Sequence, residues 1–220
     1  SEMKGGDVAG FDQLARQALS PGQFDLPQTI FAKDTWKYLT DRCQEGAKEP
    51  PFLNYFWNWR FTHLPLLRVL TAELPEARCY HTVSTGYAGL MAAAARLRTG
   101  TPLILTEHGI YTKERRMELA QADWLFDGVD QETREAHAAF FRDWWINMFT
   151  AMSRLAYRHA DVITTIYNGN RRLQVADGAD PAKIRVIPNG IDVDRLAGMK
   201  PALPLPGKPV VALVGRVVPI

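Results

Sequence analysis

The stretch R-C-Y-H-T-V-S-T-G-Y-A-G-L-M-A-A-A-A-R-L-R-T-G-T-P-L-I-L-T (residues 78–106) decides the fold of this chain. Its first part, residues 78–83, predicts a short strand before a Ser-Thr-Gly turn. The alanine-rich residues 88–97 predict a helix that Gly100 ends. Residues 102–106 are mainly apolar and predict a second strand. The order of strand, helix and strand predicts a β-α-β unit with parallel strands and a right-handed crossover.

The same alternation continues toward the C-terminus. We expect helices at residues 113–125 and 131–159, a third strand at 162–166, a short helix at 170–175 and a fourth strand at 184–187. Short apolar strands that alternate with helices are typical of an open, doubly wound sheet that is buried on both faces. The sequence therefore predicts an α/β fold, a Rossmann-like parallel sheet with helices on both faces.

The residues before this core predict a helical extension of the same domain. Residues 1–77 are expected to form its N-terminal portion, in which Asp34 is the N-cap of one helix. Residues 52–61 are rich in aromatic side chains, most of which are expected to be core or contact residues. The Rossmann-like core itself spans residues 78–200.

A proline-rich linker and a further strand follow the core. Prolines recur at residues 201, 204, 206 and 209, so residues 201–208 are interpreted as a linker. Residues 209–220 predict the first strand of a second, incomplete domain, because the chain leaves no room for a partner strand. The chain is therefore expected to be a truncated piece of a two-domain protein.

The composition excludes several classes of protein. The net charge of +2 is too near neutral to indicate binding to nucleic acid, for which clustered Lys and Arg side chains would be expected. No run of about 18 apolar residues predicts a membrane-spanning helix. Cys43 and Cys79 form no C-x-x-C pair, which favours reduced thiols in a reducing compartment. We therefore expect a cytoplasmic protein that binds no nucleic acid.

Ligands of an open parallel sheet bind beyond the carboxyl ends of its strands, where helix N-termini offer free N–H groups. The first strand is followed by Ser84, Thr85, Gly86 and Tyr87. Gly86 permits a tight turn, and the hydroxyl groups either cap the next helix or hold a sugar or phosphate. The residues alone leave both alternatives open.

The second strand ends in the residues Thr106-Glu107-His108-Gly109. A carboxylate beside an imidazole is poorly suited to structural filling at a buried strand end. Successive side chains on a strand point in opposite directions, so only one of them faces a ligand easily unless the chain turns, which Gly109 permits. An imidazole titrates at about 6.5 when unperturbed and can donate or accept a hydrogen bond at neutral pH, which makes His108 the main candidate.

The fourth strand leads into the segment I-P-N-G-I-D (187–192). Pro-Asn-Gly predicts a turn in which Gly190 supplies a positive φ. The triplet D-V-D at residues 192–194 superficially matches the D-x-D pattern that holds a metal and a nucleotide diphosphate. We interpret Asp192 as a helix cap instead and expect no metal site.

Four segments stand in a fixed order: H-T-V-S-T-G-Y-A-G (81–89), P-L-I-L-T-E-H-G-I-Y (102–111), I-R-V-I-P-N-G-I-D (184–192) and V-A-L-V-G-R-V-V-P-I (211–220). Together they resemble the retaining GT-B glycosyltransferases of family 4, and T-E-H-G-I-Y is similar to a branch of that family that acts in exopolysaccharide synthesis. The resemblance implies two Rossmann-like domains that face each other across a cleft. The N-terminal one mainly serves the acceptor, and the C-terminal one binds the sugar nucleotide.

The resemblance also implies roles for single residues. His108 is expected near the donor sugar and the scissile bond, and Arg216 against the donor diphosphate. The expected substrate-binding residues are Ser84, Gly86, Tyr87, Glu107, Gly109, Asn189 and Gly190. The implied reaction transfers a hexose or N-acetylhexosamine from a UDP-sugar with retention of configuration. It needs no cofactor or metal, because basic side chains and a helix N-terminus neutralise the leaving diphosphate.

The expected partners are a UDP-sugar, a sugar or polysaccharide acceptor, and a membrane-bound polysaccharide synthase complex. The last would hold this cytoplasmic protein at the periphery of the inner membrane. The paired glutamates (E-x7-E) of such enzymes belong to the C-terminal domain and have no counterpart here, so this chain alone is expected to transfer no sugar. Two alternatives stay open: a GT-B-fold UDP-sugar epimerase, and a non-catalytic module that docks onto a polysaccharide synthase through residues 52–61.

Overall fold

The structure is a computed structural model that describes three ranges of the chain: residues 25–44, 51–121 and 131–198. The chain divides into two compact units, residues 1–187 and residues 188–220. The predicted linker at 201–208, the predicted strand at 209–220 and Arg216 lie outside the described residues.

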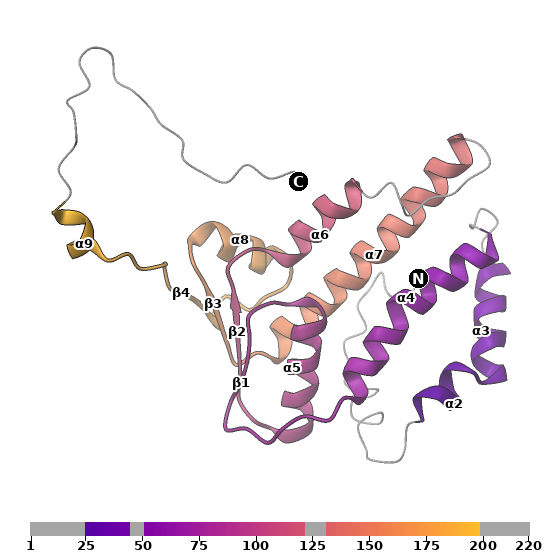
Figure 1. Cartoon of the computed structure of the whole chain (residues 1–220), viewed down its shortest axis with the longest axis horizontal. Helices are drawn as coiled ribbons and strands as arrows, with labels where there is room; N and C mark the ends of the chain where they lie inside the picture. The colour runs from indigo at the N-terminus through magenta and orange to yellow at the C-terminus, as the bar shows by residue number, and fades with distance from the viewer. Residues whose placement is uncertain (1–24, 45–50, 122–130, 199–220) are drawn as a thin grey trace, which may run out of the picture. The chain divides into compact units, whose positions relative to one another are not determined.

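The first unit is built on a sheet of four parallel strands, which lie in the same order in space as along the chain (Figure 1). The strands are β1 (Tyr80–Thr82), β2 (Leu103–Glu107), β3 (Val162–Thr165) and β4 (Ile184–Val186). Leu105 in the middle of β2 is paired with Thr82 on one side and with Ile163 on the other. At the carboxyl end of β2, Glu107 lies opposite Thr165. The predicted α/β class and parallel sheet are confirmed.

Helices connect the strands and flank the sheet. In the first unit they are α2 (Leu26–Ile30), α3 (Lys33–Gln44), α4 (Phe52–Thr71), α5 (Gly86–Thr99), α6 (Tyr111–Ala120), α7 (Gln131–His159) and α8 (Asn168–Ala176). The helices and strands predicted between residues 78 and 187 are all present, with ends that differ by a few residues. One cap was predicted wrongly, because α3 begins at Lys33 and Asp34 lies inside its first turn.

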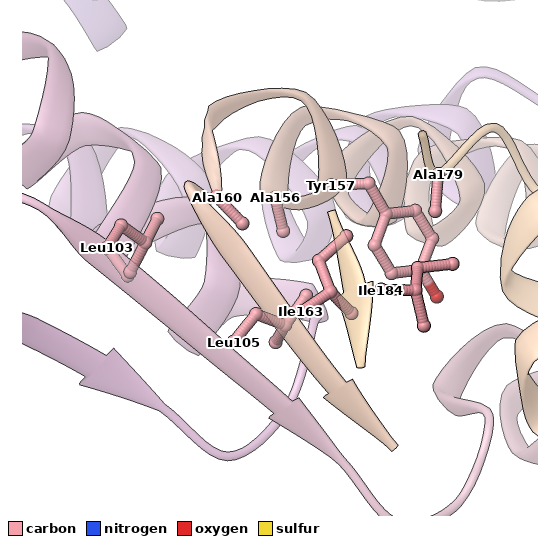
Figure 2. Close-up of a cluster of buried hydrophobic side chains, with 9 residues drawn as sticks. Leu103, Leu105, Ala156, Tyr157, Ala160, Ile163, Ala179 and Ile184 are labelled. Atoms are coloured by element: carbon pink, nitrogen blue, oxygen red, sulfur yellow. The ribbon is translucent and has the colours of Figure 1, made fainter. Parts of the chain in front are cut away.

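One face of the sheet packs against the helices. Burial alternates along β2, where Leu103, Leu105 and Glu107 are buried and the residues between them are half-buried. Figure 2 shows Leu105 and Ile163 facing the small side chain of Ala156 on α7. Because alanine adds little bulk, α7 packs closely against the strands, and the middle of the inward face forms an apolar core.

The opposite face of the sheet is more open in the part of the chain that the structure describes. Its side chains are half-buried or exposed, and they are those of His81, Ile104, Thr106, Val162, Thr164 and Arg185. Two contacts link three of them across the strands: His81 Nε2 lies 2.9 Å from Thr106 Oγ1, which lies 2.7 Å from Thr164 Oγ1. The covering of both faces by helices stays a prediction.

Helices α5 and α7 lie side by side over the inward face (Figure 1). A Cβ placed on Gly89 would lie 2.8 Å from the Cβ of Ala156, closer than carbon atoms pack. The two helices therefore approach each other where α5 has no side chain. The two helices also share an apolar cluster with α4, which includes Leu70, Leu90, Ala94, Met148 and Met152.

The aromatic-rich α4 is divided between core and surface. Tyr55 and Trp59 are buried and pack in a cluster that includes the half-buried Trp144 of α7. Trp57 and Phe61 are 41% and 59% exposed, and their stacked rings lie 5.7 Å apart. The predicted core role is therefore confirmed for the side of α4 that faces α7.

Candidate functional site

The carboxyl ends of β1 and β2 meet the N-termini of α5 and α6 at one edge of the sheet. Gly86, the first residue of α5, has a φ of 68°, which glycine adopts without the steric penalty of a Cβ. A Cβ there would lie 2.7 Å from the ring of Tyr111, the first residue of α6. The tight turn predicted at Gly86 is confirmed, and it brings the starts of two helices into contact.

The hydroxyl group of Thr85 points into the protein instead of capping α5. Thr85 is the N-cap residue, but its side chain makes no capping hydrogen bond. Its Oγ1 accepts a hydrogen bond from Ser153 Oγ at 2.9 Å and donates a long one to Glu107 Oε1 at 3.5 Å. The backbone oxygen of Ser84 accepts the hydroxyl of Thr82 at 2.8 Å. Helix capping is therefore wrong for Thr85, whereas the binding role of Ser84 stays a prediction.

Two half-buried tyrosines lie at this edge. The rings of Tyr87 and Tyr111 both contact Phe149 of α7 edge-on, at 6.5 Å and 5.6 Å. Burial raises the pKa of both phenols, so both stay protonated at neutral pH. The guanidinium of Arg115 lies 5.0 Å from the centre of the Tyr111 ring and pairs with Glu118 on its own helix. Arg115 is therefore engaged within α6.

Glu107 and His108 lie in opposite environments although they are adjacent in the chain. Glu107 is 2% exposed and lies on the inward face of the sheet. His108 and Gly109, directly after the carboxyl end of β2, are exposed. The two side chains therefore differ in exposure, as the alternation along a strand predicts, and the binding roles of His108 and Gly109 stay predictions. The expected substrate contact of Glu107 is corrected, because its carboxylate lies inside the core.

Four uncharged donors surround the Glu107 carboxylate. Its Oε2 accepts hydrogen bonds from the Tyr157 hydroxyl at 2.7 Å and from Gln174 Nε2 at 3.0 Å. Its Oε1 accepts the backbone N–H of Tyr111 at 3.2 Å and the longer bond from Thr85. Within residues 25–44, 51–121 and 131–198, no ion pair involves Glu107. Hydrogen bonds alone therefore compensate the burial of this group.

This environment raises the pKa of the Glu107 carboxyl, because burial disfavours its charged form. The hydrogen bonds from Gln174, Tyr157 and the Tyr111 N–H act in the opposite direction and limit the rise. Burial and the adjacent Glu107 carboxylate raise the pKa of Tyr157, so its hydroxyl stays protonated and donates. The group is arranged as a hydrogen-bonding centre and not as an acid or base open to a substrate.

Helices α7 and α8 supply functional-site residues that the sequence did not predict. Ser153 and Tyr157 are one helical turn apart on α7, and Asn170 and Gln174 are one turn apart on α8. All four side chains are buried. Asn170 Nδ2 donates to the backbone oxygen of His108 at 2.7 Å. The available signal was the four-residue spacing of polar residues, which places each pair on one face of its helix.

Asn189 and Gly190 belong to the second unit, where both are exposed. The predicted positive φ of Gly190 is wrong, and a Cβ there would meet no atom within 4 Å. Asp192 Oδ1 accepts the backbone N–H of Arg195 at 3.0 Å, at the start of α9 (Val193–Ala197). This bond confirms Asp192 as a helix cap. The binding roles of Asn189 and Gly190 stay predictions.

Neither a metal-binding group nor a membrane-spanning helix lies within the described ranges of the chain. None of their His, Cys, Asp and Glu side chains form a group of three that could hold a metal ion. None of their helices has both the length and the apolar character that crossing a membrane requires. The expected absence of a metal and the expected cytoplasmic location both stay predictions.

A parallel sheet with flanking helices, and polar residues at the carboxyl ends of its strands, defines an α/β domain of the Rossmann-like class. The chain belongs to the family described as a domain of unknown function (DUF3492), which matches residues 3–182. Comparisons with curated proteins and with solved structures find no match. The family match covers nearly all of the first unit.

Proposed function

We propose that this chain is the acceptor-side part of a retaining GT-B glycosyltransferase of family 4 that uses a UDP-sugar. The observation that carries the proposal is the exposed His108 at the carboxyl end of β2, a strand with a neighbour on each side. Asn170 holds its backbone oxygen, and the preceding Glu107 is anchored in the core. A ligand-accessible imidazole on a rigid support at this end of a parallel sheet is well placed to bind a sugar.

The family to which the chain belongs supports this placement, because it is known as an N-terminal domain associated with glycosyltransferases. The finer proposal rests on the segment T-E-H-G-I-Y-T-K-E-R-R (106–116) and on Asp143-Trp144-Trp145 in α7. Both resemble PelF, the cytosolic glycosyltransferase of Pel exopolysaccharide synthesis. The proposed acceptor is accordingly a growing exopolysaccharide.

In the proposed reaction, the bond between the anomeric carbon of the donor and the diphosphate oxygen breaks. An acceptor hydroxyl oxygen forms a bond to that carbon on the same face, and its proton passes to the departing UDP. His108 donates or accepts a hydrogen bond with the donor sugar beside the breaking bond. The diphosphate is proposed to bind the second domain, where Arg216 and a helix N-terminus would neutralise it.

The test is UDP release by the full-length protein from UDP-hexoses and UDP-N-acetylhexosamines in the presence of a polysaccharide acceptor. His108→Ala is expected to lower kcat by about 10²-fold, the typical cost of removing one hydrogen bond made to the reacting groups. His81→Ala, which removes an exposed imidazole from β1, serves as the matched control and should leave the rate within about 2-fold. Equal rates for His108→Ala and the unaltered protein contradict the proposal.

The exposed side of α4 favours a second candidate function, docking onto a polysaccharide synthase. Leu53, Trp57 and Phe61 follow one another at one-turn intervals and are 63%, 41% and 59% exposed. If docking is the function, Trp57→Ser combined with Phe61→Ser reduces polymer output, whereas His108→Ala leaves it unchanged. The third alternative is a UDP-sugar epimerase. Product analysis of the turnover assay distinguishes it from the other two, because an epimerase changes the configuration of the sugar and does not transfer it to the acceptor.

A further inference from the structure

Glu107 links the elements that meet at the site edge. It is the last residue of β2, and its side chain reaches α6 through the Tyr111 N–H, α7 through Tyr157 and α8 through Gln174. Thr85 connects it to the start of α5. In the described part of the chain, Glu107 is the only carboxyl group among the buried side chains. Such a group is costly to bury, so its retention calls for a structural or functional reason.

The chain is fixed on both sides of the His108 ring. Before it, the backbone oxygen of Glu107 accepts the hydroxyl of Thr165 at 3.1 Å. The backbone oxygen of His108 itself is held by Asn170. After it, the backbone N–H of Tyr111 donates a hydrogen bond to Glu107 Oε1 at 3.2 Å. This bond ties the far end of the turn formed by residues 108–110 to the end of β2. The exposed ring therefore extends from a turn whose backbone is anchored on both sides.

We propose that Glu107 is a positioning residue, whose side chain sets the direction of the turn that presents His108 at the sheet edge. The inference rests on the proposed function, in which His108 contacts the donor sugar. This role requires that both side-chain oxygen positions, Oε1 and Oε2, keep a group that forms hydrogen bonds. It requires no negative charge, because the four donors are neutral. Glu107 then acts through the backbone of residues 108–111 and does not touch the substrate.

The isosteric amide should fulfil this role. In Glu107→Gln, the amide oxygen can replace Oε1 and accept the Tyr111 N–H. The amide nitrogen then faces the Tyr157 hydroxyl, which accepts as well as donates, and the Gln174 amide. Gln174 Oε1 has no partner among the described residues and becomes an acceptor once its amide turns over. Glu107→Ala removes all four links and leaves the donors without acceptors.

The experiment compares Glu107→Ala and Glu107→Gln in the full-length protein. Glu76→Gln is the matched control, because Glu76 is exposed between α4 and β1. UDP-sugar turnover gives kcat and KM. NMR of the protein with labelled histidine follows the His108 imidazole, whose signals are those missing from His108→Ala.

Glu107→Ala is expected to shift the His108 signals and to lower kcat by about 10- to 100-fold, with KM within about 3-fold, as for a misplaced catalytic group. Glu107→Gln and Glu76→Gln should keep the signals in place and kcat within about 3-fold. Unchanged signals and kcat in Glu107→Ala overturn the positioning role. Equal losses in Glu107→Ala and Glu107→Gln overturn the claim that hydrogen bonding suffices.

If Glu107→Ala does not fold, Tyr157→Phe replaces it, since this change keeps the ring in the core and removes one donor. A smaller shift of the His108 signals supports the proposal, and the absence of a shift overturns it. If the unaltered protein turns over no UDP-sugar, the proposed function fails. The NMR comparison still decides whether Glu107 positions His108, because it needs no activity.

Discussion

Gly86→Ala is expected to destabilise the first unit strongly, because the added methyl group is unfavourable for two separate reasons. The first cost arises from the φ of 68°, at which a residue with a Cβ loses about 1–2 kcal/mol. The second arises because the new Cβ would lie 2.7 Å from two ring carbons of Tyr111. Forcing a methyl group into so tight a contact costs about 1–3 kcal/mol.

Moving the Tyr111 ring aside would disturb its packing. It packs edge-on against Phe149 at 5.6 Å, and the guanidinium of Arg115 lies 5.0 Å from its centre. The free energy of unfolding should therefore fall by about 2–5 kcal/mol. A domain of this size has a total stability of about 5–15 kcal/mol, so the loss should be evident in any denaturation curve.

Urea denaturation of the 220-residue chain, followed by circular dichroism, measures this loss. Gly190→Ala is the control, because a Cβ there meets no atom within 4 Å, and its effect should stay within about 0.5 kcal/mol. When it is added to Tyr111→Ala, Gly86→Ala should cost only the backbone term of about 1–2 kcal/mol, because the steric clash is then absent. A loss below about 0.5 kcal/mol in Gly86→Ala would refute the described contact between the two helix starts.

Three further changes test the packing and the buried ionisable groups. Gly89→Ala places a Cβ 2.8 Å from that of Ala156 and should lower the free energy of unfolding by about 1–3 kcal/mol. If the additional change Ala156→Gly restores none of this stability in urea denaturation, the contact is not the cause. Burial lowers the pKa of His63, against the opposing effect of the Trp59 backbone oxygen. The unfolded chain then binds the proton more readily, so this part of the stability is complete above about pH 6.5 and declines by up to about 1.4 kcal/mol per unit below it. His63→Gln should remove that decline, and an identical pH slope in both proteins would contradict the assignment. The raised pKa of Glu107 has the opposite effect on the pH dependence of stability. Its contribution to the free energy of unfolding is present below about pH 4.5 and is lost as the pH rises. Glu107→Gln should therefore gain stability relative to the unaltered protein between pH 4 and pH 8. A constant difference across that range would exclude Glu107 as the source.

The elements of the sheet were predictable because their signals are local. The apolar run at residues 102–106 became β2, displaced by a single residue. Gly100, with a φ of 71°, ends α5 as its sequence position indicated, since a left-handed C-cap favours glycine. The alternation of residues on a strand also predicted that Glu107 and His108 would have different surroundings.

The support of the site was not predictable, because it depends on contacts between distant segments. Tyr157 is 50 residues from Glu107, and Asn170 is 62 residues from His108. No local pattern pairs them, and Glu107 consequently resembled a ligand contact when only its neighbours in the chain were considered. Gly190 shows the reverse error: its turn motif is local, yet its φ is not positive. Such motifs state a preference that the surrounding chain can override.

The anomeric configuration of the product is the most direct measure of the proposed chemistry at His108. The full-length protein would receive a UDP-sugar carrying ¹³C at C1, and NMR would report both the configuration and the rate of transfer. The predicted product keeps the donor's configuration, and its rate of formation falls by about 10²-fold when the imidazole is removed. An inverted product, or one formed equally fast without the imidazole, contradicts the assignment of a retaining sugar transfer to this edge of the sheet.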